Sequence, residues 1–162
     1  MSRLRKWPGA KGSAVVVSEQ EGVRMLHLGG DAVQSAMRLA SPETLELEYT
    51  RAMMAFLLFC PQPREVLMVG LGAGSIPRFL HARMPEARLT VVEINGGVIA
   101  AARQYFGMPA EDRRLRVVLG DGAVHVPAHP GCADVLMLDG FEDGAHATEL
   151  CTQRFYDAAY AA

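Results

Sequence analysis

Short apolar runs alternate with stretches of helical spacing from residue 65 to the end of the chain. Each run is bounded by glycine, proline or polar turn residues. Continuous apolar runs are typical of parallel strands buried on both faces, because helices cover both sides of such a sheet. The predicted strands are EVLMVG at 65–70, RLTVVEI at 88–94, LRVVLG at 115–120 and ADVLMLD at 133–139. The pattern predicts an α/β fold built of βαβ units.

The first part of the chain has a different pattern. AVVVS at 14–18 and VRMLHL at 23–28 are rich in residues that favour strands, and the polar residues 19–22 between them favour a turn. This arrangement predicts a β-hairpin, and a third strand is expected around 33–35. Residues 1–13, before the hairpin, are expected to form a mobile polar arm.

A helix is predicted between the hairpin and the parallel strands, over residues 41–59. Ser-Pro-Glu provides its start, since proline is well tolerated at the first helical position, and the apolar residues that follow lie close to helical spacing. Pro61 and Pro63 end the helix. We therefore predict two units: an N-terminal arm, hairpin and helix at 1–62, and the α/β unit at 63–162.

The last predicted element is a helix at 150–161, directly after the loop that follows the fourth parallel strand. A four-stranded sheet that stops there leaves one strand edge without a partner, which favours aggregation. Further strands usually follow in such a sheet. We therefore expect that C-terminal strands are missing from this chain, or that a partner covers the edge.

Composition and charge are those of a packed protein. Of the 162 residues, 50% are hydrophobic and 21% are charged, and the formal net charge is −2. This balance predicts neither nucleic-acid binding nor a basic membrane patch. No apolar run is long enough for a signal peptide or a membrane span, so a cytoplasmic location is expected. Three widely spaced cysteines and five scattered histidines predict reduced thiols and no metal site.

The first predicted parallel strand ends in the glycine-rich loop VGLGAGS, with glycines at Gly70, Gly72 and Gly74. Glycines allow a sharp turn and a close approach of the backbone to a ligand, and the next helix begins there with free amide groups. The dinucleotide fingerprint requires glycine or alanine where this chain has Ser75, which disfavours NAD. The spacing is similar to the first motif of S-adenosylmethionine-dependent transferases. The alternative is a tight turn with a purely structural role.

Acidic residues follow the other parallel strands at the same predicted edge. Glu93 ends the second strand, where a carboxylate can accept hydrogen bonds from both ribose hydroxyls; the alternative is a surface acid. Asp121 and Gly122 follow the third strand, where a carboxylate can accept the amine of an adenine, although Asp-Gly is also common in turns. Asp139 closes the fourth strand. Because ligands bind at the carboxyl ends of such strands, we predict an adenosine site with Gly70, Gly72, Gly74, Glu93, Asp121 and Gly122.

At this point the chain resembles the spermidine synthase (polyamine aminopropyltransferase) family. The segments that carry the resemblance are GVRMLHLGG, AVQS, EYTRAMM, VLMVGLGAGS, VVEIN, GDG, VLMLDGFED and LCTQRFYD. In that family a β-hairpin region precedes a Rossmann-like domain that binds decarboxylated S-adenosylmethionine, and an amine then takes up the aminopropyl group. The resemblance implies nucleoside roles for Glu93 and Asp121, and substrate-side roles for Gln34, Tyr49 and Asp139. It also implies a homodimer.

Three positions depart from the family pattern. Ala73 stands where the glycine loop of the family has an aspartate that binds the aminopropyl amine. Glu142 stands at the second aspartate of the family's Asp-x-x-Asp-Pro pattern, the catalytic base. Arg51 replaces the glutamate of a Tyr-His-Glu segment, and this charge reversal is expected to disfavour a polycation. The candidate catalytic residues are therefore Asp139, Glu142 and Tyr49.

The sequence thus predicts a transferase that uses S-adenosylmethionine or its decarboxylated form as co-substrate and alkylates a small amine or another acceptor. Two alternatives stay open: a non-catalytic relative that binds a nucleoside, and a small-molecule methyltransferase. An NAD-binding module is the third and least favoured hypothesis, because of Ser75.

Overall fold

A four-stranded parallel sheet forms the centre of the α/β part, as the apolar runs predict. The computed structural model describes residues 5–8, 14–142 and 145–162. The strand order is β7-β6-β5-β8, with every pair parallel. The strands are β5 (Glu65–Val69), β6 (Arg88–Glu93), β7 (Leu115–Leu119) and β8 (Val135–Leu138). β5 and β6 lie in the middle of the sheet, so their carboxyl ends are flanked by the loops of both outer strands.

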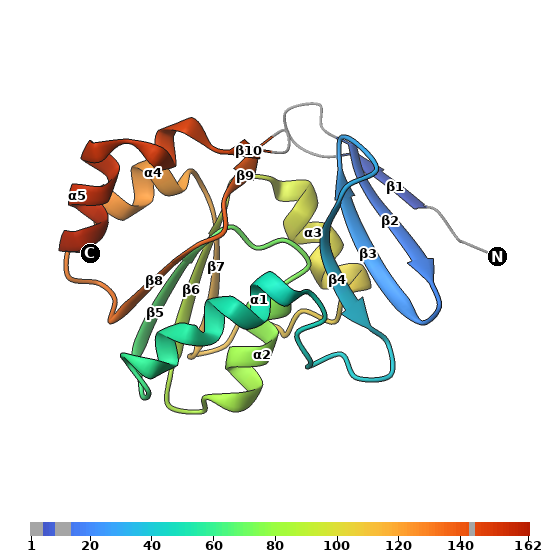
Figure 1. Cartoon of the computed structure of the whole chain (residues 1–162), viewed down its shortest axis with the longest axis horizontal. Coiled ribbons are helices and arrows are strands. Elements are labelled where there is room, and N and C mark those ends of the chain that lie inside the picture. Colours follow the sequence, from blue (N-terminus) through green and yellow to red (C-terminus); the bar gives the residue numbers. More distant parts are fainter. Residues whose placement is uncertain (1–4, 9–13, 143–144) are drawn as a thin grey trace.

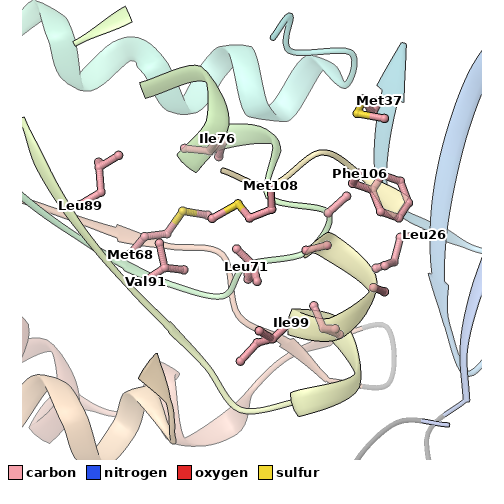
Figure 2. Close-up of a cluster of buried hydrophobic side chains, with 14 of the residues drawn as sticks. Leu26, Met37, Met68, Leu71, Ile76, Leu89, Val91, Ile99, Phe106 and Met108 are labelled. Carbon is pink, nitrogen blue, oxygen red and sulfur yellow. The ribbon is translucent and has the colours of Figure 1, made fainter. Parts of the chain in front are cut away.

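Helices cover both faces of this sheet, which confirms the prediction (Figure 1). Val66 and Met68 of β5 belong to a core cluster that also contains residues of α2 and α3, and Figure 2 shows Met68 and Met108 lying toward each other within it. Leu67 and Val69, whose side chains point to the opposite face, belong to a second cluster with residues of α5. The helices are α2 (Ser75–Arg83), α3 (Gly96–Tyr105), α4 (Gly122–His125) and α5 (Gln153–Ala161).

The N-terminal region is a four-stranded antiparallel sheet, which is larger than the predicted hairpin. It has the order β1-β2-β3-β4, and α3 lies between it and the parallel sheet (Figure 1). Its strands are β1 (Arg5–Pro8), β2 (Ala14–Gln20), β3 (Val23–Leu28) and β4 (Val33–Arg38). The third strand is confirmed as β4. The prediction of a mobile arm over the whole of 1–13 is wrong for Arg5–Pro8, because these residues pair with β2.

The predicted helix over 41–59 is much shorter in the structure. Helix α1 covers Glu48–Met53, and a 3₁₀ helix, η2, continues it over Met54–Leu58. The preceding residues form turns instead: Thr44 donates its backbone N–H and its hydroxyl to the carbonyl of Ser41. The carbonyl of Pro42 accepts from Nε of Arg78 at 2.6 Å, so it is drawn toward α2. Tertiary contacts therefore override the local start signal.

The loop after β8 contains two short strands and a 3₁₀ helix before α5. These elements are β9 (Phe141–Glu142), β10 (Ala145–His146) and η4 (Thr148–Cys151), and a further 3₁₀ helix, η3 (Val126–Ala128), follows α4. The predicted C-terminal helix is confirmed as α5, with η4 covering its expected first residues. In the part of the chain that the structure describes, none of the helices has the length and apolar character that a membrane crossing requires. The division into units at residue 62 stays a prediction.

Candidate functional site

The glycine loop between β5 and α2 passes very close to the end of β8. Gly70, Gly72 and Gly74 all have positive φ angles, of 94°, 53° and 71°. A Cβ atom at Gly70 would lie 2.1 Å from the carbonyl oxygen of Asp139, much closer than any real contact allows. A Cβ atom at Gly74 would lie 2.6 Å from Sδ of Met108. The loop therefore needs glycine both for its backbone angles and for its close packing.

Glu93, the last residue of β6, is bound directly to this loop. One carboxylate oxygen, Oε2, accepts the backbone N–H of Leu71 at 2.8 Å, and Oε1 accepts the backbone N–H of Asn95 at 2.8 Å. The residue is only 8% exposed. Burial raises the pKa of Glu93, and the hydrogen bonds from backbone N–H groups oppose that rise. Each carboxylate oxygen can accept a second hydrogen bond, so the carboxylate keeps capacity for a ligand.

Asp121 and Gly122 lie at the carboxyl end of β7, where α4 begins. Asp121 is exposed, and its Oδ1 accepts the backbone N–H of Ala123 at 2.8 Å, which caps α4. Gly122 is buried against Val69 of β5. Asp121 and Gly122 therefore have the structural role in a turn that the sequence left open as the alternative to ligand binding. This cap uses only one of the two carboxylate oxygens of Asp121.

Tyr49 and Asp139, which lie far apart in sequence, meet on the other side of the glycine loop. The Tyr49 hydroxyl donates to Oδ2 of Asp139 at 3.2 Å and lies 3.4 Å from the carbonyl oxygen of Gln34. Burial, and then the negative charge of Asp139 and the hydrogen bond to it, raise the pKa of Tyr49 well above its ordinary value. At neutral pH the Tyr49 hydroxyl therefore keeps its proton and donates it in the hydrogen bond to Asp139.

The antiparallel sheet also reaches this edge. A Cβ atom at Gly72 would lie 3.3 Å from Oγ of Ser35, and the hydroxyl of Ser75 donates to the carbonyl of Ala36 at 3.1 Å. The glycine loop is thus enclosed by the end of β8, by Glu93 and by β4. Gln34, one residue before Ser35, is held at the same place. The structure therefore brings the glycine loop, Glu93, Asp139, Tyr49 and Gln34 together.

Two further residues were singled out from the sequence, Glu142 and Arg51. Glu142 lies in β9, of which only the strand pairing is described, so its catalytic role stays a prediction. The effect expected of the Arg51 charge on a polycation stays a prediction. In the structure, Nη1 of Arg51 donates to the carbonyls of Leu45 and Glu46, both at 2.9 Å. A helix turns by about 100° per residue, so Arg51 projects from α1 on nearly the opposite side from Tyr49. The charge reversal is directed away from the Tyr49–Asp139 pair.

Two apolar residues at this edge were missed by the sequence reasoning. Ile94 directly follows Glu93 and is 45% exposed, and Leu119 ends β7 and is 64% exposed. The Leu119 side chain lies 3.8 Å from the place of a Cβ at Gly96, at the beginning of α3. Exposed apolar side chains beside a buried acid can cover the flat face of an aromatic base. The sequence offered one indication of this role, because Ile94 lies next to Glu93 and Leu119 lies just before Gly120 and Asp121.

Among the residues that the structure describes, no three His, Cys, Asp or Glu side chains gather in a way that would hold a metal ion. The three cysteines are free. The polar groups of the site are thus carboxylates, backbone amides, a tyrosine hydroxyl and main-chain carbonyls. Such groups suit an uncharged sugar, a base and an amine.

The parallel sheet, the glycine loop and the acid at the end of β6 define the class of Rossmann-like α/β proteins. The profile of the family described as "Spermine/spermidine synthase domain" matches residues 46–162. A polyamine aminopropyltransferase from Chromobacterium violaceum is 41% identical over 143 residues, which are 88% of this chain and 55% of the relative. The chain belongs to the spermine/spermidine synthase family. It spans about half the length of the curated relatives that it matches.

Solved structures agree with this assignment. A probable spermidine synthase from Corynebacterium glutamicum has a TM-score of 0.83 at 22% identity, over 97% of this chain and 59% of that chain, and shows the shared fold. A spermidine synthase in complex with the transition state analogue AdoDATO has a TM-score of 0.78 at 25% identity, over 99% of this chain and 54% of that chain. The predicted family and fold class are confirmed.

Proposed function

We propose that this protein is a spermidine-synthase-like transferase that uses an adenosyl-sulfonium donor to alkylate a small amine. The hydrogen bond between the Leu71 N–H and Glu93 carries the proposal, because it fixes a buried carboxylate against the glycine loop. Two supports come from relatives: the Chromobacterium violaceum protein is named an aminopropyltransferase, and the spermidine synthase structure holds a transition state analogue. S-adenosylmethionine or its decarboxylated form would serve as co-substrate.

The donor's nucleoside would lie across the carboxyl ends of β5, β6 and β7. In this arrangement Glu93 accepts hydrogen bonds from the ribose hydroxyls, while the backbone of the glycine loop passes close beneath the ligand. Asp121 and the neighbouring Gly122 receive the adenine amine, with the free carboxylate oxygen of Asp121 as acceptor. Ile94 and Leu119 would cover the faces of the base.

The acceptor would lie between Tyr49, Gln34 and Asp139. An alkylamine has a pKa near that of lysine, about 10.4, so it arrives protonated and must lose a proton before it can attack. Asp139 binds the ammonium group and then takes its proton, while the Tyr49 hydroxyl holds the carboxylate in place. The amine's lone pair then forms a bond to the carbon next to sulfur, the carbon–sulfur bond breaks, and a neutral thioether leaves. Glu142 is the second candidate base.

Ligand binding tests the nucleoside part of the proposal. We expect 5'-methylthioadenosine and S-adenosylmethionine to raise the melting temperature, and NAD to leave it unchanged. At a ligand concentration 100 times Kd, the expected stabilisation is about 2.7 kcal/mol. Glu93→Ala should abolish it, whereas Glu86→Ala, which removes an exposed acid, should not. Full retention of binding in Glu93→Ala would refute the ribose assignment.

Turnover tests the transferase part. Putrescine incubated with decarboxylated S-adenosylmethionine should yield methylthioadenosine and an aminopropylated amine. A methylated product from S-adenosylmethionine would instead identify a methyltransferase. Binding without turnover, across a panel of amines, would favour the non-catalytic alternative. The homodimer, the cytoplasmic location and the identity of the acceptor stay predictions.

A further inference from the structure

A cavity lies beside helix α1 and is lined in part by Arg51, which projects from α1 away from Tyr49. It has a volume of about 360 Å³ and opens to solvent. Its wall comes from the turns before α1, from α1 and η2, and from the second half of α2. Figure 1 shows where α1 and α2 lie in the fold. The lining residues are Glu43, Thr44, Leu45, Arg51, Met54, Phe79 and Arg83. None of them belongs to the glycine loop or to the strand ends of the candidate site.

The lining combines an apolar interior with positive charge. Leu45 is only 8% exposed, and Met54 and Phe79 are half-buried, so the deeper wall is hydrocarbon, thioether and aromatic ring. Arg51 and Arg83 are exposed and also line the cavity. An aromatic or alkyl group would gain by leaving water for such a wall, and a charged end would remain near the opening.

The two arginines are available to a ligand. Four other arginines of the chain are paired with carboxylates: Arg24, Arg38, Arg88 and Arg103. Arg83, by contrast, makes no hydrogen bond or ion pair with any residue that the structure describes. Arg51 donates through Nη1 to two main-chain carbonyls, which fixes its guanidinium group, and it forms no ion pair with a carboxylate among the described residues.

The single acid of the cavity, Glu43, does not cancel this charge. Its negative charge also acts on Arg78, a guanidinium that is only 4% exposed and whose Nη2 has no hydrogen-bond partner among the described residues. With Arg51 and Arg83 against Glu43, the lining has an excess of one positive charge.

From these observations we infer that this cavity binds a small organic anion, a carboxylate with an aryl or alkyl body. The volume lies at the lower end of the range for small-molecule pockets, about 300 to 1,000 Å³. A guanidinium group binds a carboxylate through two parallel N–H bonds, and it repels an ammonium group. The preferred ligand therefore has the charge opposite to that of an amine acceptor. The inference does not depend on the proposed transferase activity, since none of the cavity residues takes part in it.

The test uses 3-phenylpropionate as probe and 3-phenyl-1-propanol as a neutral probe with the same carbon skeleton. Titration followed by NMR should show the carboxylate binding with shifts at Met54 and Phe79, and the alcohol binding roughly tenfold more weakly or worse. Binding of the carboxylate should weaken as salt is added. Equal affinity for the two probes would overturn the inference, and so would the absence of binding at millimolar concentration.

Two variants complete the test. Arg83→Gln should weaken binding of the carboxylate about tenfold, and Arg83→Glu should abolish it. Arg113→Gln is the matched control, because Arg113 is also exposed and the change in net charge is the same. None of these three substitutions should alter the binding of methylthioadenosine. The cavity inference and the proposed transferase function can therefore fail independently of each other. Unchanged affinity of Arg83→Gln for the carboxylate would contradict the assignment.

Discussion

Replacing Gly70 by alanine is the most direct test of how the strand ends are packed. Gly70 has φ of 94°, which side-chain-bearing residues rarely adopt, and an added Cβ would meet the backbone of Asp139 at 2.1 and 2.7 Å. The atoms that the Cβ would meet belong to the main chain, so they cannot move aside as the flexible end of a side chain could. The ends of β5 and β8 must therefore separate by roughly 1 Å before the methyl group fits.

The loss of folding free energy caused by Gly70→Ala can be worked out roughly from the structure. The left-handed backbone alone costs about 1.5 kcal/mol for alanine relative to glycine. Separating the strand ends strains the hydrogen bond from the Asp139 N–H to the Val69 carbonyl, now 2.8 Å, which adds about 1 kcal/mol. Overpacking adds about 1 to 3 kcal/mol. We expect a total destabilisation of about 3.5 to 5.5 kcal/mol, a large part of the roughly 5 to 15 kcal/mol typical of a folded protein.

Gly107→Ala is the matched control. Gly107 also has a positive φ, 60°, but an added Cβ there would meet nothing within 4 Å. Only the backbone cost of about 1.5 kcal/mol should appear. The free energy of unfolding is measured by urea titration followed by circular dichroism, with unchanged m values. If the two variants agree within about 1 kcal/mol, the close approach of Gly70 to Asp139 is wrong.

Two further predictions concern ionisation. Because the pKa of Tyr49 is raised, titration of the four tyrosines by ultraviolet absorbance should show one that ionises above the usual value of about 10. Tyr49→Phe should remove this late ionisation step. If Tyr49→Phe instead reduces the main ionisation step, the raised pKa of Tyr49 is refuted. Backbone N–H groups of Glu65 and Arg64 lower the pKa of Asp134, so its stabilising effect is present above about pH 4 and is lost as the pH falls through the lower folded value. Asp134→Asn should therefore lower stability at neutral pH and flatten the acid limb of a urea-unfolding series; an unchanged acid limb would contradict this.

The parallel sheet was predictable because each strand carries its own signal. Runs such as EVLMVG are almost entirely apolar, and burial on both faces requires that. The start of α1 was not predictable in the same way. Ser41 and Pro42 have the local chemistry of a helix start, but the carbonyl of Pro42 binds Arg78, which lies 36 residues away in sequence. The strand β1 was missed because its stability comes from pairing with β2 rather than from its own residues.

The residues of the candidate site also differ in how far the sequence could predict their positions and contacts. Glu93 and the glycine loop are predictable, since both lie at the carboxyl ends of strands that pair with each other, and the topology alone places them at one edge. The side of the helix from which Arg51 projects relative to Tyr49 also follows from helical spacing, because the two residues are two positions apart. The partners of Arg51 were not predictable. Its Nη1 binds the carbonyls of Leu45 and Glu46, which precede α1 and were expected to lie inside the helix, whereas α1 begins at Glu48.

The residue at position 73 decides how much negative charge the glycine loop can offer to a substrate. Ala73 is fully buried, with 0% exposure, and belongs to the apolar core cluster beside Leu71 and Ile76. An aspartate at this position would have to ionise in apolar surroundings unless a cation lay against it, which costs several kcal/mol. With Arg51 directed elsewhere, the alanine at this position is the main departure from the family pattern near the glycine loop. Under the proposed function, the Tyr49–Asp139 pair would then supply the negative charge on the acceptor side of the site, and the choice between amine acceptors should depend on it.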